Sequence, residues 1–213
     1  MDLIIRRMSP EFAADYFDFF DHRAFSDNSP FYPCYCNAFN MTDAQIQALF
    51  ARARANGGDV EDFRIVLREA AVEQVAQGII HGYLAYDGDI SIGWCNANDK
   101  QNYSHYGEFD LDALDAAMDF KELIADDGIQ RIKSIVCFEI APEYRGKGIA
   151  TALLRRVCED AVRDGYDKIE VYPVIRDARE ELDFTGPVHL YEKFGFVRTD
   201  QHGKILVMQK TLK

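Results

Sequence analysis

Residues 135–154, IVCFEIAPEYRGKGIATALL, place a glycine-rich segment between two kinds of secondary structure. The first six residues are mostly apolar, which is typical of a buried strand. Apolar residues then recur at helical spacing as far as Gly165, and this pattern predicts a helix over residues 145–165. The segment between them, PEYRGKGIA, holds two glycines and two cations where the expected helix begins.

This glycine-rich segment has the chemistry of an anion site. Unpaired N–H groups and a partial positive charge at a helix N-terminus attract anions. Gly146 and Gly148 let the backbone approach a bulky anion closely. Arg145 and Lys147 add positive charge beside it. The segment therefore predicts a cradle for a phosphate or pyrophosphate group.

Two common phosphate-binding motifs fit the segment poorly. A P-loop requires G-x-x-x-x-G-K-[ST], but Ala141 stands five positions before Gly146, and a glycine follows Lys147 where serine or threonine is needed. A Rossmann fingerprint requires G-x-G-x-x-G/A, but Thr151 takes its last position. In addition, residues 141–145 separate the strand from the first glycine, where that fingerprint has a tight turn.

A third kind of cradle matches better. The sequence RGKGIA at residues 145–150 resembles the [RQ]-x-x-G-x-[GA] signature of the GCN5-related N-acetyltransferases, the GNAT superfamily. The sequence LYEKFGF at residues 190–196 is similar to the late helix-and-turn motif of the same family. The two motifs stand in the family's order about forty residues apart, and the resemblance covers residues 129–212.

The resemblance implies an α/β fold of the mixed α+β kind, the GNAT fold. This fold has a central twisted mixed sheet of six to seven strands, flanked by helices and splayed between strands four and five. Those two strands would be residues 132–140 and 168–173. The residue pattern agrees, because strands alternate with helices, Asp87-Gly88 predicts a hairpin, and residues 112–125 predict a short helix. With no repeat or linker, we expect one domain over residues 1–213.

The resemblance also implies acetyl-CoA as the cosubstrate. Its pantetheine arm would lie in the split of the sheet and form hydrogen bonds with the backbone near Phe138 and Ile140. Its pyrophosphate would lie on the amides of seven consecutive residues: Arg145, Gly146, Lys147, Gly148, Ile149, Ala150 and Thr151.

Acetyl transfer from a thioester to an amine requires a neutral amine and a proton for the departing thiolate. Tyr191 matches the tyrosine that commonly supplies this proton in the family, and a phenol with a pKa near 10 can share a proton with a thiolate near 8.5. Glu139 interrupts an apolar strand, where burial would raise its pKa as a general base requires. An edge-exposed carboxylate and a salt bridge to an arginine are the alternatives. Alternation predicts that Glu139 shares a strand face with Cys137 and Ile135.

The family usually builds its acceptor pocket from the first two helices, the loop between them and the sheet beneath. Phe31, Tyr32 and Tyr35 lie in a loop punctuated by prolines, where packing alone explains an aromatic residue less readily. We expect these three side chains to line the acceptor pocket. The segment DFTGPVHLY, residues 183–191, is expected to border the same site.

The cysteines indicate a reducing environment. Their number, five, is odd, and the sequence starts with no secretory signal, so we expect free thiols and a cytoplasmic protein. Cys34 and Cys36 are one residue apart, which is not the spacing of a zinc site, so no metal site is predicted.

The charge and hydropathy of the sequence limit the classes of partner that we expect. The net charge is -12, which argues against a general nucleic-acid-binding protein and is compatible with a cationic amine substrate. Residues 108–127 are strongly acidic and predict either a solvated helix face or a rim that attracts a cation. Charges interrupt every apolar run before it reaches the length of a membrane span, so we expect no membrane association.

These observations predict an acetyl-CoA-dependent N-acetyltransferase. The expected acceptor is a primary amine of a small molecule, which attacks the thioester directly in a ternary complex. Two alternatives stay open: a non-catalytic sensor that binds acetyl-CoA or CoA, and an acetyltransferase for protein lysines or N-termini. A homodimer is the default assembly for a small soluble enzyme.

Overall fold

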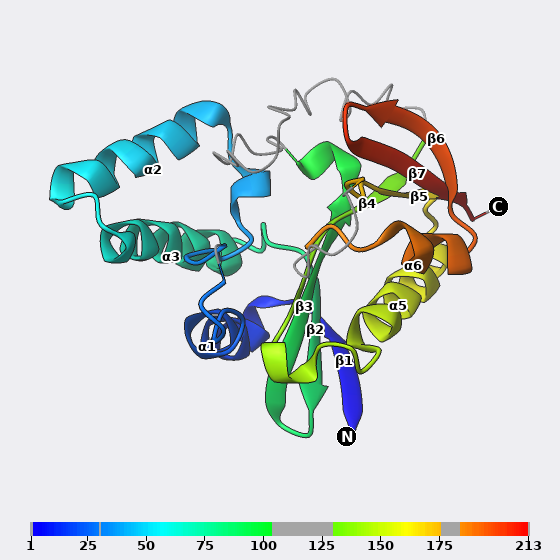
Figure 1. Ribbon diagram of the computed structural model, residues 1–213, viewed down its shortest axis with the longest axis horizontal. Coiled ribbons are helices and arrows are strands. Elements are labelled where there is room, and N and C mark those ends of the chain that lie inside the picture. Colours follow the sequence, from blue (N-terminus) through cyan, green and yellow to red (C-terminus); the bar gives the residue numbers. More distant parts are fainter. Residues whose placement is uncertain (1, 30, 104–129, 176–183, 213) are drawn as a thin grey trace.

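The computed structural model describes residues 2–29, 31–103, 130–175 and 184–212. Its centre is a mixed seven-stranded sheet with the order β1-β2-β3-β4-β5-β7-β6 (Figure 1). Neighbouring strands are antiparallel except for β4 and β5, which are parallel. The strands are β1 (Leu3–Arg7), β2 (Gly82–Asp87), β3 (Ile90–Asp99), β4 (Ile132–Ile140), β5 (Lys168–Val171), β6 (Val197–His202) and β7 (Ile205–Thr211).

Helices cover both faces of this sheet. One face carries α1 (Ala13–His22) and α3 (Val60–Ala76), with α2 (Asp43–Asn56) packed against α3, and the other carries α5 (Ile149–Arg163) and α6 (Val188–Lys193) (Figure 1). The mixed sheet and its flanking helices confirm the fold expected from the sequence. The helix predicted over residues 112–125 and the acidic stretch 108–127 lie outside the described residues. In the described part of the chain, no helix is both long enough and apolar enough to cross a membrane.

Capping residues fix where the first long helices begin. Thr42 accepts a hydrogen bond from the Gln45 amide, and the Gln45 side chain bonds back to Thr42, which makes a capping box at the start of α2. Asp59 and Asp62 form the same arrangement at the start of α3. This second cap explains why the residues that follow Asp59 are helical.

The apolar core has one layer on each side of the sheet. Tyr16, Phe19 and Phe20 of α1 pack against Trp94 of β3 on the first side. Leu153, Leu154 and Val157 of α5 belong to the layer on the second side. Because helices cover both faces of the sheet, β2, β3 and β4 are buried along almost their whole length rather than at alternate residues.

The sheet opens between β4 and β5. The two strands pair only where Ile132 to Ile135 lie opposite Lys168 to Val171. Strand β4 then continues to Ile140 with no pairing to β5, which ends at Val171. This divergence confirms the expected split between the fourth and fifth strands.

The helix after the split begins later than the sequence pattern predicts. Residues 145–148 are not helical, and α5 starts at Ile149. Arg145 is extended, and Gly146 and Gly148 have φ values of 73° and 82°. Since this left-handed conformation is incompatible with a continuing α-helix, the glycine-rich segment forms a loop that leads into the helix.

Candidate active site

The glycine-rich loop leaves space beside its backbone. A Cβ atom added to Gly146 or to Gly148 would meet no atom of the described residues within 4 Å. The positive φ at both positions favours glycine in any case. The first turn of α5, a helix of 15 residues, follows directly and leaves N–H groups without partners inside the helix. The loop therefore combines free donors, a helix dipole and room for a large anion.

The two cations of this loop have different surroundings. The Lys147 amine lies over the Tyr144 ring, 4.9 Å from its centroid. The guanidinium of Arg145 turns back toward the sheet, where it donates to the Ile140 carbonyl at 3.0 Å and to Glu139 at 3.4 Å. It also forms a 2.5 Å ion pair with Asp27. Arg145 thus joins the loop to the last residues of β4.

Glu139 is a buried acid beside this arginine. It is 9% exposed. Burial raises the pKa of Glu139 to about 7, although the nearby Arg145 guanidinium lowers it, and the Asp27 carboxylate raises it further. A carboxyl group that titrates near neutral pH can accept a proton under physiological conditions. Glu139 therefore forms the salt bridge to an arginine that the sequence left open, and it also has a pKa that suits a general base.

A β-bulge corrects the predicted faces of β4. Asn96 pairs with Cys137 and Ala97 pairs with Ile135, so Val136 has no partner on β3. Val136 and Cys137 both belong to the core layer of α1, whereas Ile135 belongs to the layer of α5 with Phe138 and Ile140. The prediction that Ile135 shares a face with Glu139 is therefore wrong.

Tyr191 lies in α6 on the other side of the split. Its side chain is fully buried, and its hydroxyl donates a hydrogen bond to the Thr185 carbonyl. The same segment reaches β4, because the Phe138 amide donates to the Phe184 carbonyl at 2.6 Å. Residues 184–187, which we call the strap, therefore connect the split edge of β4 to Tyr191 and lead into α6 (Figure 1).

The strap requires glycine at position 186. Gly186 has a φ of 82°, and a Cβ atom there would lie 2.6 Å from the Tyr191 hydroxyl. We expect Gly186→Ala to destabilise the fold by about 2–4 kcal/mol, because backbone strain adds to a clash in a packed region. Gly195→Ala is the matched control, since Gly195 has a φ of 81° and no described atom within 4 Å of the added Cβ. Urea unfolding that gave equal losses for both variants would contradict this role of Gly186.

The three aromatic residues predicted to line the acceptor pocket have different positions. The Phe31 ring packs edge-on against Phe184 of the strap, with 5.1 Å between centroids. Tyr32 is 39% exposed and its ring lies 6.3 Å from that of Phe25. Tyr35 lies in the core beneath α1, and its hydroxyl donates to Asp21 at 2.6 Å. Only Phe31 is thus brought next to the strap, and packing accounts for Tyr35.

Sequence reasoning missed Asp27. It stands in the loop after α1, 118 residues before its partner Arg145, and no local pattern marks it. The two cysteines of that loop are used in packing: Cys34 accepts a hydrogen bond from the Cys36 amide at 3.2 Å, and Cys36 is buried against Asn96. The contact with Asn96 fixes this loop against β3.

The open edge of the splayed mixed sheet carries a glycine-rich loop and a helix N-terminus, and comparison with known families identifies the class of protein. Residues 78–198 match the family model described as the acetyltransferase (GNAT) domain, which is more than half of the 213-residue chain. The chain therefore belongs to the GNAT acetyltransferases and is an N-acetyltransferase. The matched region includes both the cradle and Tyr191. No curated protein sequence matches the chain.

Solved structures share the fold at low sequence identity. A GNAT-family acetyltransferase from Streptococcus pneumoniae is 17% identical, with 100% of both chains covered and a TM-score of 0.50. The ribosomal-protein-S5-alanine acetyltransferase from Vibrio fischeri is 14% identical over 99% of this chain and 93% of that chain, with a TM-score of 0.51. A chain of the NatC complex, solved with Gag peptide and CoA, is 13% identical with 100% of both chains covered and a TM-score of 0.51.

Proposed function

We propose that this protein transfers an acetyl group from acetyl-CoA to a primary amine of a small molecule by direct attack in a ternary complex. The observation that carries the proposal is the cradle at the open edge of β4. There, two positive-φ glycines with space beside them precede α5. A bulky pyrophosphate fits such a site, because amides and a helix dipole stabilise it without a crowding side chain.

The residues of the cradle fit the pyrophosphate of acetyl-CoA. At the split, the backbone groups predicted to bind the pantetheine arm already have hydrogen-bond partners. The amides of residues 145–151 would hold the pyrophosphate, and bound acetyl-CoA would supply the activated thioester. The amide of Phe138, predicted to hold the pantetheine arm, already donates to Phe184. If Phe138 is to bind the cofactor, the strap carbonyl must leave this amide. The predicted contact at Ile140 involves a residue whose carbonyl is already occupied by Arg145.

Two side chains would move protons. Glu139 accepts a proton from the incoming ammonium group, directly or through a water molecule, because its pKa of about 7 leaves it substantially ionised at neutral pH. Arg145, which is itself paired with Asp27, holds this carboxylate in place. The Tyr191 hydroxyl donates its proton to the departing thiolate sulfur. To do so it must exchange the Thr185 carbonyl for the sulfur as hydrogen-bond acceptor.

The acceptor is a small amine in this proposal for two reasons. The chain carries a net charge of -12, which favours a cation, and the strap with Phe31 supplies an aromatic wall near the split. A panel of small amines and of peptides with free N-termini or lysines tests the choice. Turnover only with peptides would assign a protein acceptor, and no turnover with cofactor binding intact would assign a sensor. Sedimentation would test the predicted homodimer.

Substitution of Gly148 tests whether the cradle binds acetyl-CoA. We expect acetyl-CoA at about 100 times its dissociation constant to stabilise the parent protein by roughly 2.7 kcal/mol in thermal unfolding. Gly148→Ala should raise the dissociation constant at least tenfold, since the new methyl group enters the space beside the loop. Gly88→Ala is the matched control: Gly88 has a φ of 60° and the same open surroundings, but it lies in the β2–β3 hairpin. Equal affinities in the two variants would remove the cradle from the proposal.

A further inference from the structure

One ion pair joins the turn after α1 to the glycine-rich loop at the end of β4. Asp27 lies in this turn, and its carboxylate is 2.5 Å from the guanidinium of Arg145, the first residue of the cradle. The backbone fixes the turn, because the Asn28 amide donates to the Phe25 carbonyl at 3.2 Å and Asn28 has a φ of 59°. A defined backbone therefore presents Asp27 to a residue 118 positions further along the chain.

The guanidinium of Arg145 is engaged on three sides by the protein itself. Its Nε donates to the Ile140 carbonyl at 3.0 Å, Nη1 contacts Asp27, and Nη2 donates to Glu139 at 3.4 Å. These three acceptors hold the planar group toward the end of β4. The positive charge of Arg145 therefore acts on the proposed base, and the amides of the cradle stay available for the pyrophosphate.

The two carboxylates share this guanidinium unequally. Asp27 approaches it to 2.5 Å, whereas Glu139 stays at 3.4 Å. Strong charge-assisted bonds of this kind measure about 2.7–2.9 Å, so the bond to Glu139 is weak. The side chain of Asp27 is 31% exposed and that of Glu139 only 11%. The more buried acid thus has the poorer contact, although a buried carboxylate has the greater need of a strong partner.

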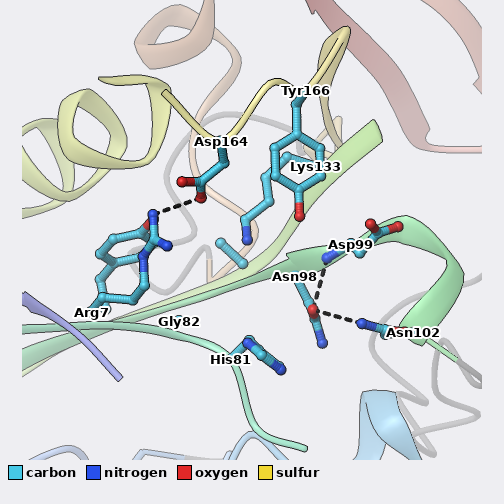
Figure 2. Close-up of a pocket in the computed structure, with 11 residues that line it drawn as sticks. Arg7, His81, Gly82, Asn98, Asp99, Asn102, Lys133, Asp164 and Tyr166 are labelled. Carbon is cyan, nitrogen blue, oxygen red and sulfur yellow. Dashed lines mark hydrogen bonds and ion pairs between the residues drawn. The ribbon is translucent and has the colours of Figure 1, made fainter. Parts of the chain in front are cut away.

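The opposite end of β4 shows a different balance of charges. A cavity of about 250 Å³ lies there, and its lining includes two cations, Arg7 and Lys133, and two carboxylates, Asp99 and Asp164 (Figure 2). Arg7 forms an ion pair with Asp164 at 2.7 Å. Burial lowers the pKa of Lys133 to about 8, and the carboxylates of Asp164 and Asp99 oppose this change. Charges are matched at that end, whereas at the cradle end two acids share one arginine.

Few titratable groups act on Glu139. Within the described part of the chain they are Arg145 after β4, Asp27 after α1, Cys137 on β4 and Cys34 in the loop between α1 and α2. Burial raises the pKa of the Cys34 thiol, and hydrogen bonding to a neighbouring thiol together with burial raises that of Cys137. Both thiols are therefore uncharged at pH 7, which leaves Arg145 and Asp27 as the charges that control the carboxyl group.

We propose that Asp27 is a positioning residue for acetyl transfer, which holds Arg145 away from Glu139 and so leaves the Glu139 carboxylate able to accept a proton. This inference rests on the proposed function of Glu139 as the base. A short, two-pronged bond to Arg145 would stabilise the carboxylate and make it a weaker base. Asp27 prevents that bond by accepting the stronger contact from the same guanidinium.

Asp27→Asn tests the proposal through two measurements on the full chain. Carbon NMR follows the titration of the Glu139 carboxyl group, whose resonance is assigned by its absence from Glu139→Gln. We expect its pKa to fall by about 1, because a negative charge is lost and Arg145 is released toward Glu139. In the kinetics, kcat at pH 6 should rise about fivefold as a share of its plateau value, since about half of Glu139 is then ionised rather than about a tenth.

The matched control is Glu69→Gln. This substitution also breaks an ion pair between an acid and an arginine, that of Glu69 with Arg52, but the pair lies between α2 and α3. Neither the pKa of Glu139 nor the pH profile should change. Equal shifts in Glu69→Gln and Asp27→Asn would overturn the proposal, because the effect would then reflect net charge alone.

Arg145→Gln supplies a change of opposite sign. Loss of the guanidinium leaves Asp27 uncompensated, so the pKa of Glu139 should rise and the limb of the profile should move to higher pH. A contact that only held the two loops together would not shift the titration in opposite directions in the two variants. An unchanged or raised Glu139 pKa in Asp27→Asn would overturn the proposal. A lowered pKa that the kcat profile does not follow would instead overturn the role of Glu139 as the base.

Discussion

We expect Tyr191→Phe to lower kcat about 100-fold and to leave the dissociation constant of acetyl-CoA within about twofold. Loss of a positioned proton donor typically costs between 10² and 10⁴ in rate, and we expect the lower end because water can partly replace the phenol. Phenylalanine retains the packing of the buried ring against Phe196, whose centroid is 5.5 Å away. Steady-state rates with the best amine, together with equilibrium binding of acetyl-CoA, measure the two quantities separately.

The control for this variant is Tyr86→Phe. Tyr86 is also a buried tyrosine whose hydroxyl donates to a single acceptor, Asp15, at 2.9 Å, but it lies in β2. Each variant loses the hydrogen bond that its hydroxyl donates, so we expect each to lose about 1 kcal/mol of stability. Only Tyr191→Phe should lose rate. Equal rates for the two variants would show that the Tyr191 hydroxyl only holds the strap.

We also expect Glu139→Gln to lower kcat about 100-fold or more and to change the pH profile. With the carboxylate as base, kcat rises as pH increases through about 7, where Glu139 loses its proton. Glutamine cannot accept the proton, so that limb of the profile disappears. Glu143→Gln is the control, because Glu143 is exposed in the turn that follows β4 and should leave the profile unchanged. A retained limb near pH 7 in Glu139→Gln would assign the base to another group.

The same substitution should increase stability above neutral pH. The pKa of Glu139 is about 7 in the folded protein and 4.5 for the free side chain, so the folded state holds its proton more tightly. Its favourable contribution is fully present below pH 4.5 and is lost as pH rises through 7. The difference corresponds to roughly 3 kcal/mol at pH 8. Glu139→Gln removes this loss, and chemical unfolding at pH 5 and pH 8 measures it. A lower rate combined with a higher stability distinguishes a functional role from a structural one.

The parts of the site that depend on adjacent residues could be predicted from sequence. The cradle of residues 145–151 and the motif around Tyr191 are each carried by a short segment with its own glycine pattern. The resemblance carried by those motifs also implies the split between β4 and β5. The predicted start of α5 is too early, because the pattern of apolar residues does not show that Gly146 and Gly148 adopt positive φ.

The other parts depend on contacts between distant residues. The bulge at Val136 is defined by pairing with β3 and leaves no mark within β4 itself. The Phe138 amide donates a hydrogen bond to the carbonyl of Phe184 in the strap, 46 residues further along the chain. Both partners are backbone groups, so no side-chain pattern in the sequence predicts this contact. Lys133 interrupts an apolar strand and could equally have been a surface residue, so its burial in a cavity required the structure.

The bulge in β4 also bears on the opening of the sheet. It falls at Val136, directly after Ile135, the last residue of β4 that pairs with β5. A bulge bends its strand, so this extra residue turns β4 away from its neighbour and opens the sheet. Since Val136 and Cys137 face the same side, a chain without Val136 would keep Glu139 and Phe138 on their present faces. We therefore expect a chain without Val136 to keep these side chains on their present faces but to lose the opening between β4 and β5.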